Sequence, residues 1–161
     1  MMIAVIKMKL IVMSDSHGFH DKIDQVIHAH PDADAYLHCG DIDADEDLYP
    51  NLITVQGNND LFYDYPKQRI LTLMGQRILM MHGHQFPYGN RLRHMANYAR
   101  EQDCRIFFYG HTHVAAHDVI DGVHLINPGS LWRSRDQRAP SYAIVTLQED
   151  IVNVTFVFRE R

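Results

Sequence analysis

Five short polar clusters along the chain combine aspartate, asparagine and histidine, side chains that coordinate divalent metal ions. Each cluster directly follows a segment that is predicted to be a strand, at the point where a loop should begin. No cluster is compelling alone, but an ordered set of five is hard to reach by chance. The clusters are Asp15-Ser16-His17, Gly40-Asp41, Gly57-Asn58-Asn59-Asp60, His82-Gly83-His84 and Gly110-His111-Thr112-His113.

The aspartates of the first two clusters are predicted to reach one point. Asp15 is weak evidence alone, because an aspartate after a strand often caps the next helix. Asp41 ends the neighbouring strand and can offer its two oxygens to two metals. The acidic run 43–47 is not an EF-hand-type loop, because it lacks the glycine at the sixth position and the glutamate at the twelfth. It is predicted to be a solvated loop.

The two histidine pairs are stronger evidence. Two imidazoles one residue apart after a strand point to opposite sides unless a loop redirects them, so they cannot both be core residues. Gly110 gives the backbone that freedom, and we predict that His111 and His113 are both ligands. His84 is expected either to bind metal or to support the site. Asn58 offers a neutral carbonyl oxygen, although a tight turn explains its cluster equally well.

The segments between the clusters have the pattern of an α/β protein. Apolar runs in the first half predict strands buried on both faces, and open α/β sheets place ligands at the carboxyl ends of such strands. The second half changes to hairpins, one of them at Asp121-Gly122, a pair that favours a type I′ turn. Two mixed sheets packed face to face, with helices outside, are therefore expected. Strands are predicted at 9–14, 35–39, 52–56, 69–73, 76–81, 105–109, 117–120, 123–126, 142–147 and 151–158, and helices at 18–30 and 90–102.

Size and composition fit one domain, residues 1–161, that is 46% hydrophobic and can bury a substantial core. The net charge of −5, without a basic stripe, argues against binding long nucleic acids. No apolar run approaches membrane-spanning length, so no membrane partner is expected. Two distant cysteines favour a reducing, cytoplasmic location. Residues 1–7 are treated as an extension without chemistry, and a homo-oligomer is left open.

The order Asp-x-His, Gly-Asp, Gly-Asn, His-Gly-His and Gly-His-Thr-His resembles the calcineurin-like metallophosphoesterase superfamily. The short chain and the sequence Asn127-Pro128-Gly129-Ser130 resemble its small bacterial and archaeal phosphodiesterase branch. The resemblance runs from about residue 8 to residue 130. It implies a dinuclear, metal-dependent phosphodiesterase that hydrolyses small phosphodiesters by attack of a metal-bridging hydroxide.

The resemblance also assigns seven ligands to two divalent ions that share one carboxylate. One ion takes Asp15, His17, Asp41 and His113, and the other takes Asp41, Asn58, His82 and His111. Manganese is expected first, with iron, zinc, nickel and magnesium as alternatives. The four imidazoles favour manganese, iron and zinc over magnesium. Two cations, two carboxylates and a hydroxide leave one positive charge, which suits an anionic phosphoester.

Position 59 departs from the superfamily pattern. Much of the superfamily has a histidine there, regarded as the proton donor to the leaving group, followed by a glutamate, whereas this chain has Asn59 and Asp60. Asn59 cannot donate a proton at neutral pH, so the departing oxygen must take its proton from water, from His84 or from another nearby group, or need none. Small phosphodiesterases of this branch often lack the histidine too.

Two classes of alternative remain. The chain could be a phosphomonoesterase or nucleotidase of the same fold, or a non-catalytic protein-binding module, for which a retromer subunit is the precedent. Intact ligands favour an enzyme, since all seven positions carry coordinating residues. The sequence does not choose the substrate. Trp132, Arg133 and Arg135 follow the last cluster and could meet a phosphate.

Overall fold

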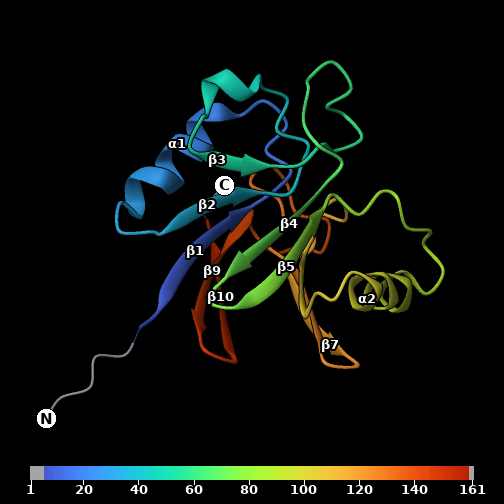
Figure 1. Ribbon diagram of the computed structural model, residues 1–161. Helices are drawn as coiled ribbons and strands as arrows, with labels where there is room; N and C mark the ends of the chain where they lie inside the picture. The colour runs from blue at the N-terminus through green and yellow to red at the C-terminus, as the bar shows by residue number, and fades with distance from the viewer. Residues whose placement is uncertain (1–5, 160–161) are drawn as a thin grey trace, which may run out of the picture.

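Two five-stranded sheets pack face to face in the computed structural model, which describes residues 6–159 (Figure 1). Each sheet mixes parallel and antiparallel neighbours, and a helix lies against the outer side of each. The predicted α/β sandwich is therefore confirmed. Residues 1–5, most of the predicted N-terminal extension, lie outside the described residues.

The first sheet joins the two ends of the sequence. Its strands are β1 (Met8–Met13), β2 (Ala35–His38), β3 (Leu52–Thr54), β9 (Ser141–Gln148) and β10 (Ile151–Phe158), in the spatial order β10-β9-β1-β2-β3. β1, β2 and β3 are parallel, and α1 (His20–Ala29) connects the first two. The C-terminal hairpin returns to pair antiparallel with β1 through β9.

The second sheet is built from the middle of the chain. Its strands are β4 (Gln68–Leu73), β5 (Gln76–Met81), β6 (Ile106–Phe108), β7 (Ala116–Ile120) and β8 (Val123–Asn127), in the order β4-β5-β6-β8-β7. β5, β6 and β8 are parallel, and antiparallel β4 and β7 form the edges. α2 (Arg91–Glu101) connects β5 and β6.

Alternating side chains of the central strands fill separate layers of the core. Leu10 and Val12 of β1 are fully buried between the two sheets, whereas Ile11 and Met13 pack in the layer that contains Ile23 of α1. Strand β5, an inner strand of the second sheet, alternates in the same way between the inter-sheet core and the layer beneath α2. This is the period of two expected for strands covered on both faces. Buried strands of this kind hold the loops at their ends in fixed positions.

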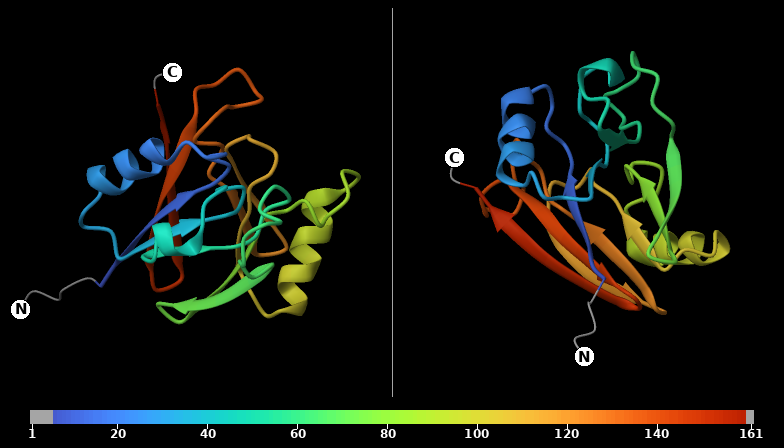
Figure 2. Two further views of the ribbon diagram at one scale, coloured as in Figure 1. Left: turned by 90° about the horizontal axis from the view of Figure 1, so that it is seen from above. Right: turned by 60° about the vertical axis from the view of Figure 1, so that its left-hand side comes forward.

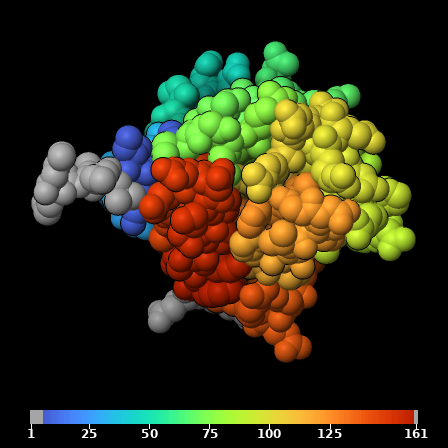
Figure 3. Space-filling model, turned by 60° about the horizontal axis from the view of Figure 1, so that its bottom comes forward, coloured from blue at the N-terminus to red at the C-terminus, as the bar shows by residue number. Residues whose placement is uncertain are grey.

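The two α-helices lie on opposite outer sides of the sandwich in both views of Figure 2. Neither helix of the described residues is long and apolar enough to cross a membrane. Figure 3 shows the C-terminal hairpin beside the β4–β5 hairpin, although the two are far apart in sequence. The side-chain amide of Gln76 donates a hydrogen bond to the Glu149 carbonyl between them.

Two local differences from the predicted elements have clear causes. The first helix begins at His20 rather than at Gly18, because Gly18 has φ +83° and the Phe19 N–H donates to the Ser16 carbonyl in a turn (3.0 Å). The acidic run predicted as a loop contains a short 3₁₀ helix, η1 (Glu46–Leu48). The Asp45 carboxylate caps it by accepting from the Asp47 N–H (3.1 Å).

Candidate metal centre

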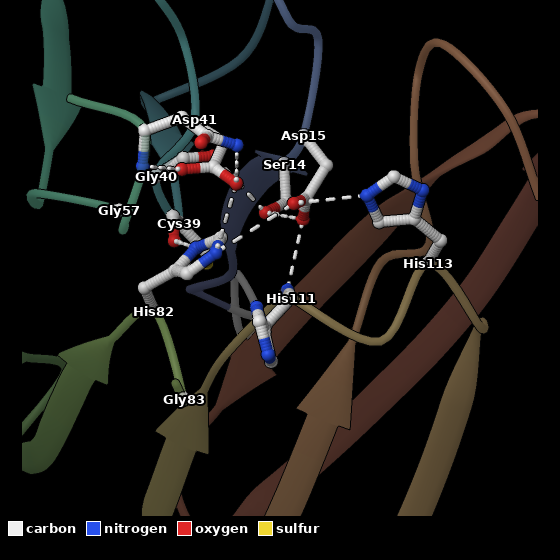
Figure 4. A network of polar contacts seen from close by, with 12 residues as sticks. Ser14, Asp15, Cys39, Gly40, Asp41, Gly57, His82, Gly83, His111 and His113 are labelled. Atoms are coloured by element: carbon white, nitrogen blue, oxygen red, sulfur yellow. Dashed lines mark hydrogen bonds and ion pairs between the residues drawn. The ribbon is translucent and has the colours of Figure 1, made fainter. Parts of the chain in front are cut away.

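The five polar clusters follow β1, β2, β3, β5 and β6, and they converge at one end of the sandwich (Figure 4). The side chains there form two sets of three potential metal ligands, and the ligand atoms of each set lie within 4.8 Å of one another. One set is Asp15, His17 and His113, and the other is Asp15, Asp41 and His82. The structure thus brings together five of the seven predicted ligands, contributed by both sheets.

Two buried carboxylates occupy the middle of this arrangement. Asp15 Oδ1 lies 3.3 Å from His113 Nε2, 3.6 Å from His17 Nε2 and 3.7 Å from His82 Nε2. Asp41 Oδ2 lies 3.2 Å from His82 Nε2 and 3.8 Å from His17 Nε2. Each carboxylate therefore faces imidazoles of both sets. Either one is placed where it could contact two ions.

The buried imidazoles are oriented for a cation. His82 Nδ1 donates to the Cys39 carbonyl (2.7 Å) and His113 Nδ1 donates to the Arg133 carbonyl (2.8 Å). A carbonyl can only accept, so when each ring is neutral these hydrogen bonds leave its Nε2 lone pair facing the carboxylates, the orientation common among metal-ligating histidines. Within the described residues, Asp15 Oδ1 and His82 Nε2 are buried and have no hydrogen-bond partner. Divalent cations would satisfy both atoms, so the residues present fit a metal centre.

The backbone at the site is mostly left-handed. Five of the seven predicted ligands have positive φ: Asp15 (54°), His17 (46°), Asp41 (57°), His111 (72°) and His113 (61°). Non-glycine residues rarely adopt this region, and each instance costs on the order of 1 kcal/mol. These turns redirect the two histidines of the last cluster, as their spacing requires. Gly110 itself does not have a positive φ, so the change of direction comes from His111 and His113 and not from this glycine.

Two glycines are needed because carboxylates approach them closely. A Cβ atom on Gly57 would overlap Asp41 Oδ1, and one on Gly110 would lie 2.6 Å from Asp15 Oδ2 and overlap Ser14 Oγ. Their sequence positions before Asn58 and His111 suggested turns. The structure shows that they make room for the two central carboxylates.

Several buried polar residues that the sequence analysis did not assign to the site support it. Asp60 is fully buried and accepts from the backbone N–H groups of Asp41 (2.7 Å), Gly57 (2.8 Å) and Asp43 (2.9 Å). Ser130 Oγ donates to the Asp15 carbonyl (2.7 Å), so the turn at residues 127–130 holds the backbone of the first cluster. The signal for Asp60 was its place at the end of the Gly-Asn-Asn-Asp cluster, where a carboxylate can bind the N–H groups of a turn.

The remaining predicted residues lie at the edge of the centre. Asn58 is exposed. Its neighbour Asn59 contacts Asp41 instead, donating to the carboxylate through the backbone N–H (2.9 Å) and through Nδ2 (3.2 Å). The His111 ring lies 5.2 Å from the His82 ring between centroids, and the exposed His84 ring lies 5.5 Å from it. The ligand roles of Asn58 and His111 stay predictions, as does a catalytic role for His84.

The charges of the site are strongly coupled. Burial would raise the pKa of Asp15, but the neighbouring imidazoles of His113, His17 and His82 outweigh it and hold that pKa well below its usual range. Burial would lower the pKa of His82, but the Asp41 and Asp15 carboxylates outweigh it and raise that pKa. Burial and the charge of His82 lower the pKa of His111 to about 4. The carboxylates are thus ionised, and His82 holds a proton more tightly than a free imidazole does.

We expect metal affinity to weaken as the pH falls through the raised pKa of His82. The proton on its Nε2 occupies the position that a metal requires and must leave before the metal binds. The apparent dissociation constant should therefore rise about tenfold for each pH unit below that pKa, beginning above the usual imidazole value of about 6.5. Titration with Mn²⁺ at several pH values measures this dependence. An affinity that does not change between about pH 5 and 8 would contradict the assignment of His82 as a ligand.

Comparison with known proteins agrees with this geometry. The calcineurin-like phosphoesterase superfamily domain matches residues 8–150 of the chain. The chain belongs to this superfamily. The match contains all five polar clusters and the strands from β1 to β9, and ends at the turn before β10. The predicted family is thereby confirmed.

Individual relatives cover nearly the whole chain. The "Probable metallophosphoesterase YsnB" of Bacillus subtilis is 34% identical over 153 residues, which is 92% of this chain and 90% of that protein. The crystal structure of a conserved protein of Streptococcus pneumoniae, described as a predicted phosphoesterase, has a TM-score of 0.88 with 31% identity and covers 96% of this chain and 91% of its own. Vacuolar protein sorting 29 of Cryptosporidium parvum has a TM-score of 0.72 with 18% identity, covering 94% of this chain and 97% of its own, and shares the fold.

Proposed function

We propose that this chain is a phosphodiesterase that hydrolyses small phosphodiesters with two divalent cations bound at the convergence of the five clusters. The observation that carries the proposal is the pair of ligand sets around Asp15 and Asp41, with Asp15 Oδ1 and His82 Nε2 buried and without partners. Manganese is the first metal to test, and Asn58 and His111 complete the proposed ligand set from the edge of the centre. Bound ions of this kind supply Lewis acidity toward a phosphoryl oxygen and acidify water near neutral pH.

The charges of the chain support an anionic substrate. The two carboxylates bring −2 against the +4 of two divalent ions, so the loaded centre is positive although the net charge of the chain is −5. Ser14 and Asn59 donate hydrogen bonds to the carboxylates of Asp15 and Asp41. Ser130 and Asp60 bind the backbone of the same two residues, so both carboxylates are positioned before a metal arrives. Such preorganisation keeps both ions and substrate in a reactive geometry.

The proposal is tested with the purified full chain after reconstitution with Mn²⁺. We expect hydrolysis of bis(p-nitrophenyl) phosphate that is lost on chelation and restored by the metal, at a higher kcat/KM than for the monoester p-nitrophenyl phosphate. Faster hydrolysis of the monoester would favour a phosphomonoesterase. A chain that binds metal but hydrolyses no phosphoester would favour the non-catalytic binding module.

A third expectation concerns the leaving group. Asn59 donates hydrogen bonds to Asp41 and carries no acidic proton, so we expect much faster hydrolysis of aryl than of alkyl diesters. General acid catalysis is typically worth about 10²–10⁴ in rate. Asn59→His should recover part of this rate factor for alkyl diesters. The ratio of kcat/KM for aryl and alkyl diesters should therefore narrow by about tenfold or more.

The variant Asn59→Ala is the control, because it loses the amide contact with Asp41 without gaining an imidazole. We expect it to lower both rates and to leave their ratio unchanged. A wild-type ratio near one would show that another group, such as His84, already protonates the leaving oxygen.

A further inference from the structure

A hollow of about 770 Å³ opens beside the metal centre and is separate from the ligand sets except at His113, which lines it. Its volume lies within the range of small-molecule binding sites. Its walls come mainly from the start of α1 and from the loop after β8, so two segments far apart in sequence form it. The proposed chemistry at the metal centre does not use this space.

Two exposed aromatic rings form one wall of the hollow. The rings of Phe19 and Trp132 are nearly parallel, with centroids 6.3 Å apart and planes inclined by 15°, and they are 43% and 36% exposed. Trp132 also packs against the ring of the predicted ligand His17, with centroids 4.9 Å apart. The aromatic surface therefore begins at the metal centre and extends away from it. Exposed aromatic faces of this kind bind planar rings by stacking.

The hollow is also basic, in contrast with the acidic chain. Lys22, Arg133 and Arg135 line it, and no carboxylate is among the described residues that line it. Within residues 6–159, the Lys22 ammonium and the Arg133 guanidinium form no hydrogen bond or ion pair, and Lys22 Nζ lies 5.5 Å from the centroid of the Phe19 ring. Cations next to an aromatic wall would attract a ligand that combines a planar ring with negative charge.

We propose that this hollow binds a nucleotide portion of the substrate. The base would stack on Trp132 and Phe19, and a phosphate other than the one at the metal centre would meet Lys22 and Arg133. A neutral lipid or a neutral aryl group would not use the three cations, and neither a sugar phosphate nor the headgroup of an anionic lipid would use the stacked rings. This inference rests on the proposed function and specifies its substrate class as nucleotide phosphodiesters.

Trp132 is the single tryptophan of the chain, so its fluorescence reports directly on the hollow. The full chain is titrated with ADP, once loaded with Mg²⁺ and once after chelation. We expect saturable quenching by ADP, and none by ribose 5-phosphate or pyrophosphate, which lack a base. Phe19→Leu should weaken ADP binding roughly 2- to 10-fold through loss of stacking. Lys22→Gln should weaken it roughly 3- to 10-fold through loss of the phosphate contact.

Lys7→Gln is the matched control, because it removes one positive charge from an exposed residue that does not line the hollow. Trp132→Leu, followed by calorimetry, should weaken ADP binding by about 5- to 150-fold. The melting temperatures of all variants establish that they fold.

The fluorescence and hydrolysis results separate this inference from the proposed function. Hydrolysis of bis(p-nitrophenyl) phosphate without saturable quenching by ADP would overturn the nucleotide site and leave the phosphodiesterase. Quenching that is equal in Phe19→Leu, Lys22→Gln and Lys7→Gln would overturn it as well. Quenching that depends on Phe19 and Lys22, in a chain that hydrolyses no phosphoester, would support the nucleotide site and reject the phosphodiesterase.

Discussion

Replacing Asp41 by alanine is expected to release both metal ions and to lower kcat/KM for a phosphodiester by about 10³-fold or more. Asp41 Oδ2 faces His82 of one ligand set and His17 of the other, so the change removes a ligand and a negative charge from both ions. Metal ions contribute several kcal/mol to such reactions, and each 1.36 kcal/mol is a factor of ten in rate. Elemental analysis after reconstitution with Mn²⁺ gives the number of ions retained.

His113→Ala is the comparison, because the predicted ligand assignment gives His113 to one ion only and Asp41 to both. We expect this variant to retain one ion per chain and to lose less activity than Asp41→Ala. Asp150→Ala, which removes an exposed carboxylate at the turn between β9 and β10, should retain both ions. Retention of both ions by Asp41→Ala would show that Asp41 is not the bridge and would leave that role to Asp15, which belongs to both sets.

Most element boundaries could be predicted from the sequence within two residues. The run at residues 9–14 predicted β1, which the structure places at Met8–Met13, because a strand buried on both faces needs a continuous apolar segment. The return of β9 to pair with β1 could not be predicted. Its partners are more than 120 residues apart, as in Ile11 and Ile144, and no local pattern encodes such a pairing.

The convergence of the ligands could also be predicted from the sequence, but the backbone conformation and the hydrogen bonds that hold them in place could not. Asp15, His17, Asp41, His82 and His113 converge because each follows a strand whose end lies at the same edge. The left-handed backbones of Asp15, His17, Asp41 and His113 carry no sequence signal beyond the neighbouring glycines. The hydrogen bonds that hold them come from single polar residues, which have no periodicity. His38 is an example: its fully buried ring accepts from the Gly40 N–H (3.2 Å) and therefore donates through Nε2 to Ser16 Oγ (3.0 Å).

Asp60→Ala is expected to destabilise the protein by about 3–6 kcal/mol. The carboxylate accepts from three backbone N–H groups, those of Asp41, Asp43 and Gly57, and alanine would leave these donors without partners. A buried donor left unpaired costs about 1–3 kcal/mol, and the total stability of a domain is about 5–15 kcal/mol. Denaturant unfolding of the metal-free chain measures the change without a contribution from bound ions.

Two further variants decide whether Asp60 acts through Asp41. Asp64→Ala removes an exposed carboxylate four residues later and should leave stability unchanged, so an equal loss in both variants would contradict the role of Asp60. Asp60→Asn keeps the volume and one accepting oxygen, and it should fold with a smaller loss. Because Asp60 holds the backbone that carries Asp41, we expect Asp60→Asn to bind metal about 10- to 100-fold more weakly than wild type, as is typical when a residue that orients a ligand is changed. An unchanged metal affinity in this folded variant would limit Asp60 to stabilising the turn.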